Sequence, residues 1–481
     1  MSTVTPNVRY VSLFAAAQYW RHEASQRGLR IIDYRKLLRR LEALIALSCV
    51  RHHDISSEVP RGVVGRTFAD SETSREYLML DTGLSNPPYN IYRGTLKDLG
   101  LFDLSKPDDP LFEGAIPLGQ AWDASAGGWL GDQIRAGSLP ESVRRDDVDS
   151  ISSAFCLCRV PDASEEQTLL VDLLFGLRNP AEEPNFDGDT WNYYGARVAS
   201  WRLLLEVIEH SPGRRLTTHY LMGRLLEPDL LGVPLGQTLR DTLFLWRWVA
   251  ARSLIELGWT LAFNQSFDIV RSTVDGLSHV DLAESVREQC QEECGRDDLA
   301  ALAAEARANC GSENWIAESF EAETQRSCVL LMICGAYASG EDLDRSGLKV
   351  HSVVDSEGDI PFRSQRERIA KGILSNTLAA EYWSETACEA LVQHTRIVLR
   401  KMAQGNPDTQ HVEYEDGRWH VPPGRDIWNP RPSSGFSRLD IALGWLRQLR
   451  MASVDNNGSW RLTEYGQATR RRCAEVYRSW A

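Results

Sequence analysis

Residues 439–468, LDIALGWLRQLRMASVDNNGSWRLTEYGQA, decide the fold that we predict for this chain of 481 residues. Apolar side chains recur every three or four positions in the first third of this stretch, which predicts a helix. The turn Asn456-Asn457-Gly458 follows, and then a short strand at 459–462. Thr463 precedes a closing helix and is a suitable N-cap residue. A helix, a two-stranded wing and a closing helix together predict a winged-helix module at residues 436–481.

A weaker form of the same order of elements lies near the N-terminus. Residues 89–99 predict a helix that Gly100 ends, and residues 111–116 predict a short strand. Gly119-Gln120-Ala121 then starts another helix, and the same three residue types start the closing helix of the C-terminal module. We therefore predict a second winged-helix-like module within residues 1–135.

The region between the two modules reads as a helical body at residues 150–403. Helical periodicity is present at 215–226, 236–265, 281–309, 313–338, 364–382 and 384–403. Residues 404–435 predict a hairpin followed by a linker rich in Pro and Gly. The fold class predicted is mainly α, a multidomain helical body flanked by N-terminal and C-terminal winged-helix-like modules with short β-hairpin wings.

Composition favours a soluble, cytoplasmic protein. The chain opens on Met1-Ser2-Thr3-Val4, which lacks the charged start and apolar run of a secretory signal. The most apolar stretch, 239–263, contains charged residues that are too costly for a membrane span, so we expect no membrane association. We expect the ten cysteines to be reduced thiols.

Charge is distributed unevenly along the chain, whose formal net charge is −14. Residues 281–323 hold twelve Asp and Glu against three Arg, whereas residues 431–481 hold nine Arg against four Asp and Glu. A basic end on an acidic body is compatible with a local nucleic-acid contact, while the acidic part faces water or protein.

The basic C-terminal module supplies the candidate DNA-binding residues. Ser and Arg at a helix start suit phosphate contact, and Arg also suits groove contact. The candidates are Ser434, Ser437, Arg438, Arg447, Arg450, Arg461, Arg470, Arg471 and Arg472. The alternative is a module used for protein contact or dimerisation.

Three groups of residues carry metal-ligand chemistry. His52-His53-Asp54 follows the end of a predicted helix. Histidines at this position also occur without a metal, because they interact favourably with the negative end of the helix dipole. Cys156 and Cys158 alternate like strand neighbours, and Cys290 and Cys294 lie one helical turn apart with Cys310 in reach by folding. Packed, reduced thiols explain both pairs, so we predict no metal and no cofactor.

The sequence contains no motif that supports an enzymatic activity. The chain contains no phosphate loop, nucleophile elbow or dinucleotide fingerprint. The carboxylates of Glu182-Glu183 and Asp187-Gly188-Asp189 lack a full calcium-loop spacing and predict a solvated loop. His394 lies on an apolar helix, which favours a core histidine over a catalytic base. We therefore predict no catalytic residues.

Several stretches resemble large uncharacterised bacterial proteins of anti-phage defence loci that carry winged-helix modules and a helical body. The stretches are Pro88-Tyr89-Asn90-Ile91-Tyr92, 96–101, Leu118-Gly119-Gln120-Ala121, 394–401 and 438–449. The resemblance implies a non-enzymatic component that works beside a nuclease or helicase encoded nearby, and it supplies no catalytic residues.

The leading hypothesis is a DNA-associated scaffold or sensor subunit of a bacterial anti-phage defence complex. The C-terminal module would contact double-stranded DNA, and the acidic body would recruit the nuclease or helicase partner; an oligomer is compatible with this role. One alternative is a cryptic metal-dependent nuclease built from scattered carboxylates. The other is a winged-helix transcription regulator, which is expected to be a symmetric dimer.

Overall fold

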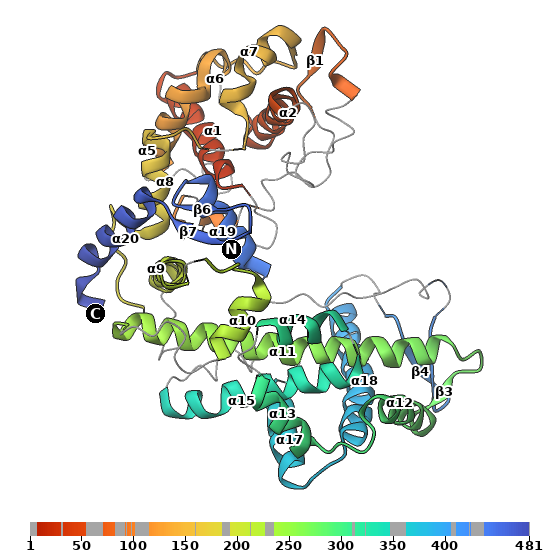
Figure 1. Cartoon of the computed structure of the whole chain (residues 1–481). Helices are drawn as coiled ribbons and strands as arrows, with labels where there is room; N and C mark the ends of the chain where they lie inside the picture. Colours follow the sequence, from red (N-terminus) through yellow and green to blue (C-terminus); the bar gives the residue numbers. More distant parts are fainter. Residues whose placement is uncertain are drawn as a thin grey trace. The chain divides into compact units, whose positions relative to one another are not determined.

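A computed structural model describes most of the chain and shows a mainly helical protein, as predicted (Figure 1). It describes residues 7–29, 32–53, 71–81, 92–101 with two gaps, 115–184 with one gap, 193–226 with one gap, 235–309, 313–346 with one gap, 362–405, 410–424 with one gap, and 437–480. No helix among these residues is both long enough and apolar enough to cross a membrane.

The chain forms two compact units. The first, which we call the terminal unit, comprises Met1–Pro184, Asn192–Arg214 and Arg438–Ala481; the second, the central unit, comprises Asn185–Trp191 and Arg215–Ser437. These units cut across the four segments predicted from the sequence, because both ends of the chain pack into one shared core. The C-terminal module belongs to the same compact unit as the N-terminal part of the chain.

Helices make up most of the terminal unit, with two small sheets. Its elements are α1 (Arg9–Gln26), α2 (Tyr34–His53), β1 (Tyr77–Met79), α5 (Ala115–Trp122), the π-helical turn Asp123–Gly127, α6 (Gly128–Arg135), β2 (Ser142–Arg144), α7 (Arg145–Phe155), α8 (Glu165–Phe175), α9 (Tyr193–His210), α19 (Ser437–Gln448), β6 (Ala452–Val454), β7 (Trp460–Leu462) and α20 (Glu464–Val476).

Helix α1 runs through the middle of the terminal unit and is buried on nearly all sides. Its Trp20 packs edge-on against Trp122 of α5, with ring centroids 5.8 Å apart. Trp122 in turn packs against Phe155 of α7 at 5.0 Å. The large aromatic surfaces thus form a continuous core between α1, α5 and α7.

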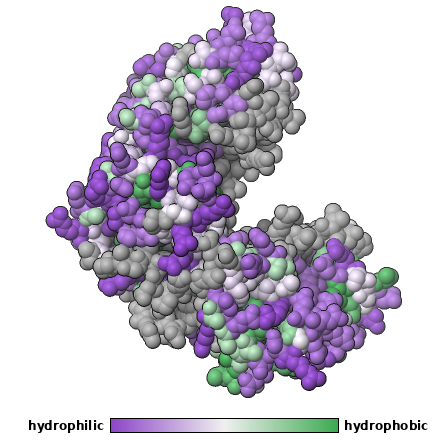
Figure 2. Space-filling view, viewed as in Figure 1, coloured by the Kyte–Doolittle hydropathy of each residue, from purple (hydrophilic) through white to green (hydrophobic). Residues whose placement is uncertain are grey.

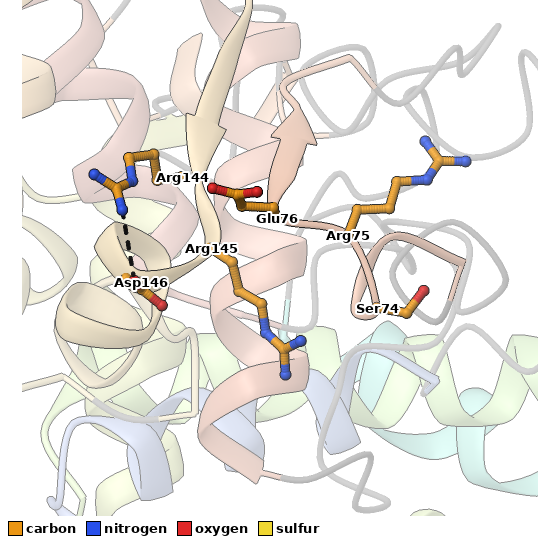
Figure 3. Close-up of a pocket in the computed structure, with 6 residues that line it drawn as sticks. All are labelled: Ser74, Arg75, Glu76, Arg144, Arg145 and Asp146. Atoms are coloured by element: carbon orange, nitrogen blue, oxygen red, sulfur yellow. Dashed lines mark ion pairs between the residues drawn. The ribbon is translucent and has the colours of Figure 1, made fainter.

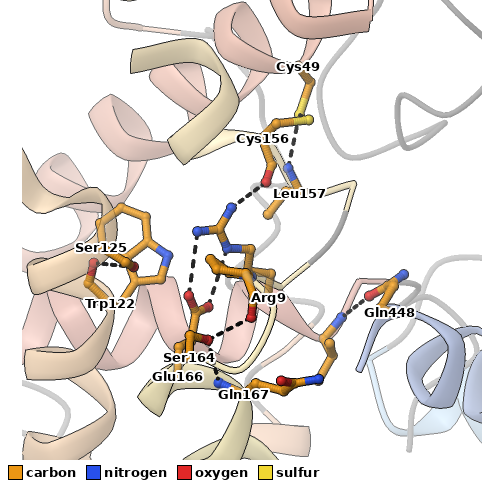
Figure 4. Close-up of polar contacts among 12 residues, drawn as sticks. Arg9, Cys49, Trp122, Ser125, Cys156, Leu157, Ser164, Glu166, Gln167 and Gln448 are labelled. Atoms are coloured by element: carbon orange, nitrogen blue, oxygen red, sulfur yellow. Dashed lines mark hydrogen bonds and ion pairs between the residues drawn. The ribbon is translucent and has the colours of Figure 1, made fainter. Parts of the chain in front are cut away.

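A buried ion pair crosses this core. Arg9 of α1 donates from Nε to Oε1 of Glu166 on α8 at 3.3 Å, and both side chains are at most 2% exposed. A second nitrogen of Arg9, Nη1, donates to the carbonyl oxygen of Cys156 at 2.6 Å (Figure 4). Because Arg9 satisfies both groups, it fixes α1, α8 and the turn after α7 to one another.

The predicted N-terminal wing at residues 111–116 is wrong where the structure describes it. Ala115 and Ile116 begin helix α5, and residues 111–114 lie outside the described residues. The sheet in this part of the chain instead pairs β1 with the distant β2, with Leu78 opposite Val143. Local alternation could not reveal this pairing, because each strand has only three residues.

The central unit is built around long helices, which lie largely where the sequence predicted them. Its elements are α10 (Thr218–Leu226), α11 (Gln237–Arg271), β3 (Leu277–Ser278), α12 (His279–Cys294), α13 (Leu299–Asn309), α14 (Glu313–Ala322), α15 (Gln325–Ser346), α17 (Phe362–Leu374), α18 (Ala379–Ala403), β4 (Glu413–Glu415) and β5 (Arg418–His420).

Two glycines allow α11 and α15 to approach closely. A Cβ atom on Gly258 of α11 would come within 2.3 Å of Met332, and one on Gly335 of α15 within 2.5 Å of the carbonyl oxygen of Ala251. Only a residue without a side chain fits at Gly335, where the neighbouring atom is backbone, whereas a side chain at Gly258 would require Met332 to move. The backbones of these two helices therefore form the tightly packed centre of this unit.

Two details of the central unit differ from the sequence prediction: one predicted helix is two helices, and the predicted hairpin gains a third strand. The predicted helix 281–309 is two helices, α12 and α13, because Gly295 ends the first with a positive φ of 61°. The predicted hairpin forms as β4 and β5, and β3 adds a third strand to its sheet. Two residues are too short a run for a sequence pattern to reveal β3.

The buried ion pair gives a first prediction. Replacing Arg9 with Met leaves the Glu166 carboxylate buried without its cation, which should cost about 3–5 kcal/mol of unfolding free energy. The double variant Arg9→Met/Glu166→Leu should recover much of this loss. Urea unfolding followed by tryptophan fluorescence measures both.

Arg27→Met is the matched control, because Arg27 is exposed and its ion pair with the half-buried Glu23 spans 4.0 Å. Its loss should cost less than about 1 kcal/mol. Equal losses for Arg9→Met and Arg27→Met would show that the buried pair does not organise the unit.

Candidate nucleic-acid interface

The C-terminal module has the local structure that its sequence predicts. Strands β6 and β7 pair antiparallel, with Ser453 opposite Arg461. The Thr463 hydroxyl accepts a hydrogen bond from the backbone N–H of Gly466 at 3.1 Å and so caps α20. The order of helix, two strands and helix is therefore confirmed.

This module packs against the beginning of the chain. The Gln448 side chain of α19 accepts the backbone N–H of Val8 at 2.8 Å and donates to Asn7 at 3.2 Å (Figure 4). The side chain of Gln167 on α8 donates to the carbonyl oxygen of Leu449 at 2.7 Å. Gln448 thus supplies the cap that α1 lacks in its own sequence.

Aromatic groups dock the module on α9 as well. Trp445 of α19 stacks on Trp201 of α9, with ring centroids 6.2 Å apart. The Arg202 guanidinium lies 5.1 Å from the centre of the Tyr477 ring, and burial lowers the pKa of this arginine. The Tyr477 hydroxyl reaches the carbonyl oxygen of Gly176 at 2.8 Å.

Three of the predicted DNA-binding arginines form ion pairs within the terminal unit. Arg450 pairs with Asp162. Arg470 lies 2.8 Å from Glu206, and this hydrogen bond is the main reason that the pKa of Arg470 is raised.

The third, Arg472, lies 2.8 Å from Asp172, a carboxylate that is only 4% exposed and that also pairs with Arg178. The positive charge of all three arginines is largely offset where it stands. The net charge of residues 431–481 therefore overstates the charge that this module can offer to a phosphate.

Three other candidate arginines, Arg447, Arg461 and Arg471, differ from these in their exposure and in their ion pairing. All three are exposed, on α19, β7 and α20 respectively, and none forms an ion pair with another described residue. Within the described part of the chain, Arg461 donates only to the hydroxyl of Ser453, at 3.3 Å. Of the remaining candidates, Ser437 and Arg438 lie in the first turn of α19, and Ser434 lies outside the described residues.

Most of the surface of α19 is buried within the terminal unit and cannot contact a ligand. Leu443, Trp445 and Leu446 are all at most 2% exposed, because the helix packs against its own unit. Among the described side chains of this helix, only Asp440 and Arg447 are exposed. This helix therefore cannot lie along a DNA groove over its whole length, as a recognition helix does.

Sequence reasoning missed a further arginine beside the wing. The backbone N–H of Trp460 in β7 donates to the carbonyl oxygen of Arg214 at 3.1 Å, and Ser459 donates to Gly213 at 3.0 Å. These bonds hold the exposed Arg214 next to the strand that carries Arg461. No local pattern could show this proximity, because about 250 residues separate the two arginines.

A small pocket of about 270 Å³ between β1 and α7 also contains arginines. Figure 3 shows Arg75, Arg144 and Arg145 pointing in different directions from its rim. Arg75 pairs with Glu72 at 2.7 Å, and Arg144 lies 3.9 Å from Asp146. Because the guanidinium groups do not converge, this pocket is a poor anion site.

A larger hollow of about 480 Å³ lies in the central unit. Three of its lining side chains are bonded to one another: Gln265 donates to Gln289 at 2.9 Å and accepts from the Trp383 indole at 2.5 Å. Asp268 and Glu293 make its lining acidic. An acidic lining of this kind would repel a phosphate.

The remaining sequence candidates show no catalytic arrangement among the residues that the structure describes. Cys290 and Cys294 approach to 3.6 Å between sulfur atoms, both buried, and Cys310 lies outside the described residues. Asp187 and Asp189 also lie outside them. His394 packs against Phe263, with ring centroids 4.6 Å apart, and burial lowers its pKa to about 4.

Comparison with known proteins adds nothing to this geometry. No family model, no curated protein and no solved structure matches the chain. The resemblance to proteins of anti-phage defence loci stays a prediction.

The half-buried His394 gives a prediction about the acid sensitivity of the central unit. The folded state holds its pKa near 4, first through burial and then through the nearby His411 and Lys401, whereas an unfolded histidine titrates near 6.5. The unfolded state therefore binds more protons between these two pKa values. Stability should be constant above pH 6.5 and should fall by roughly 3 kcal/mol as the pH drops to 4.

His394→Gln should remove this loss, because glutamine does not titrate. Thermal unfolding at pH 7, 5.5 and 4.5 measures the difference between variant and wild type. A difference that is independent of pH would contradict the lowered pKa.

Proposed function

We propose that the chain is a non-enzymatic scaffold that holds duplex nucleic acid on its terminal unit, through a winged-helix-like C-terminal module. The observation that supports this most is a set of four exposed arginines, Arg214, Arg447, Arg461 and Arg471, none of which forms an ion pair with another described residue. A guanidinium group without a carboxylate partner is available to a phosphate at little cost.

The proposed contact is to the phosphate backbone. Because α19 is largely buried, the contact is carried by exposed arginines on β7, in the adjacent loop at Arg214, in the last turn of α19 and on α20, and not by a helix laid in the groove. Backbone contacts position a protein on a duplex without reading its sequence. This favours a scaffold over a transcription regulator with a specific site.

The central unit suits a protein partner better than a nucleic acid. Helix α12 exposes Asp281, Glu284 and Glu288, which would repel phosphates. Val274 and Val280, on either side of β3, are 97% and 75% exposed. Figure 2 shows such hydrophobic side chains at the surface among hydrophilic ones. In our proposal this unit recruits the catalytic partner, a nuclease or helicase, of an anti-phage defence complex.

The test compares duplex DNA binding of the full chain with that of the triple variant Arg447→Gln/Arg461→Gln/Arg471→Gln. Binding of the wild type should weaken steeply with salt, because phosphate contacts release counterions. The variant should bind at least tenfold more weakly at low salt. Its plot of log affinity against log salt should be shallower by up to about 3, about one for each phosphate that no longer meets an arginine.

A matched control removes the same charge from the central unit. The variant Arg296→Gln/Arg366→Gln/Arg396→Gln should keep the wild-type affinity and slope, because these arginines lie on the other unit. If both triple variants bind DNA alike, the C-terminal module is not the nucleic-acid surface. A wild-type chain that binds no DNA at low salt would remove the proposal altogether.

A further inference from the structure

Four side chains with metal-binding chemistry meet in the terminal unit. His52 and His53 come from the last turn of α2, and Cys156 and Cys158 come from the turn that follows α7. One ligand atom from each residue lies within 4.8 Å of those of the other three. Within this group, the Cys158 sulfur lies 3.7 Å from Nδ1 of His52.

We propose that His52, His53, Cys156 and Cys158 bind one zinc ion. In a tetrahedral site with Zn–S bonds near 2.3 Å and Zn–N bonds near 2.0 Å, neighbouring ligand atoms are about 3.3–3.8 Å apart. The distance between Cys158 and His52 already falls in this range. The widest separation, up to 4.8 Å, requires only about 1 Å of closure around the ion.

The fold brings these residues together through contacts that need no metal. One residue before His52, Arg51 pairs with Asp149 of α7, and its Nη2 donates at 2.7 Å. The buried Arg9 holds the carbonyl oxygen of Cys156 at 2.6 Å. Both backbone segments of the cluster are thus anchored close to their ligands, which lowers the entropic cost of forming a site.

A third sulfur atom, that of Cys49, lies next to the four ligand residues. Cys49, one turn before His53 on α2, accepts the backbone N–H of Leu157 at 3.4 Å, and its sulfur lies 3.6 Å from that of Cys156 (Figure 4). Cys49 does not belong to the group of four mutually close ligand atoms. Its role is to orient the turn between Cys156 and Cys158.

The donor set indicates a structural zinc site. Two thiolates and two imidazoles suit zinc, whereas magnesium and calcium prefer oxygen ligands. Four protein ligands complete a tetrahedron and leave no position for a water molecule, so the site does not serve hydrolysis. The ion would join α2 to the turn after α7, two segments that lie about 100 residues apart in the chain.

The sequence could not favour this site over its alternatives. Taken alone, the two histidines fit a helix end and the two cysteines fit a packed core. The two histidines and the two cysteines come close enough to bind one ion only because α2 packs against α7. The prediction that the chain binds no metal rested on weighing each pair separately.

The test uses the full chain, stripped with a chelator under reducing conditions and then equilibrated with zinc. Metal analysis should find one zinc per chain at this site. Cobalt in place of zinc should give the visible absorption of tetrahedral, thiolate-bound Co²⁺, which needs no variant for its interpretation. His52→Ala and Cys158→Ser should each weaken zinc binding by more than about a hundredfold, since even the loss of an outer partner costs about 10- to 100-fold.

The controls separate ligands from neighbours. Cys290→Ser, which alters a buried thiol of the central unit, should leave the zinc affinity unchanged, whereas Cys49→Ser should weaken it by about 10- to 100-fold, less than the loss of a ligand. His52 is exposed and Cys158 is half-buried, so their variants should keep the helical circular dichroism of the wild type. A chain that binds no zinc, or whose His52→Ala and Cys158→Ser variants bind it unchanged, would overturn the proposal. Cobalt absorption without a thiolate contribution would overturn it equally.

Discussion

The ion pair between Arg9 and Glu166 is the contact on which the terminal unit depends. Two charges in a core from which water is excluded are tolerated only when they are paired and hydrogen-bonded, so α1 and α8 have one acceptable arrangement. The neighbours of the pair in sequence extend this constraint, because Val8 bonds to Gln448 and Gln167 bonds to Leu449. The beginning and the end of the chain are therefore held at the same place in the core.

This arrangement explains why the arginines of the C-terminal module divide into two groups. A module that packs into a shared core must present cations to the carboxylates of its neighbours, as Arg470 does to Glu206 and Arg472 does to Asp172. Only the arginines that point away from those neighbours, such as Arg461, keep their charge available. Charge counted along the sequence cannot distinguish these groups, since the distinction arises only when the module docks.

The sequence predicted the local elements well and their assembly poorly. The Thr463 cap and the turn before β7 depend on contacts within a few residues, and periodicity records such contacts directly. The pairing of β1 with β2 and the position of Arg214 beside β7 depend on segments far apart in the chain. The two halves of the zinc cluster were each visible in the sequence, but nothing in it indicated that α2 packs against α7.

Cys156 links the cluster to the core, because its thiol belongs to the four ligands while its carbonyl oxygen accepts from Arg9. An ion held by that thiol would restrain the same backbone position that the buried ion pair restrains from the other side. The two constraints act on one turn, so each reduces the conformational entropy that the other must overcome. Every residue of this set lies in the terminal unit, whereas His394 lies in the central unit. Metal binding should therefore raise the stability of the terminal unit, while the acid sensitivity of the central unit is left unchanged.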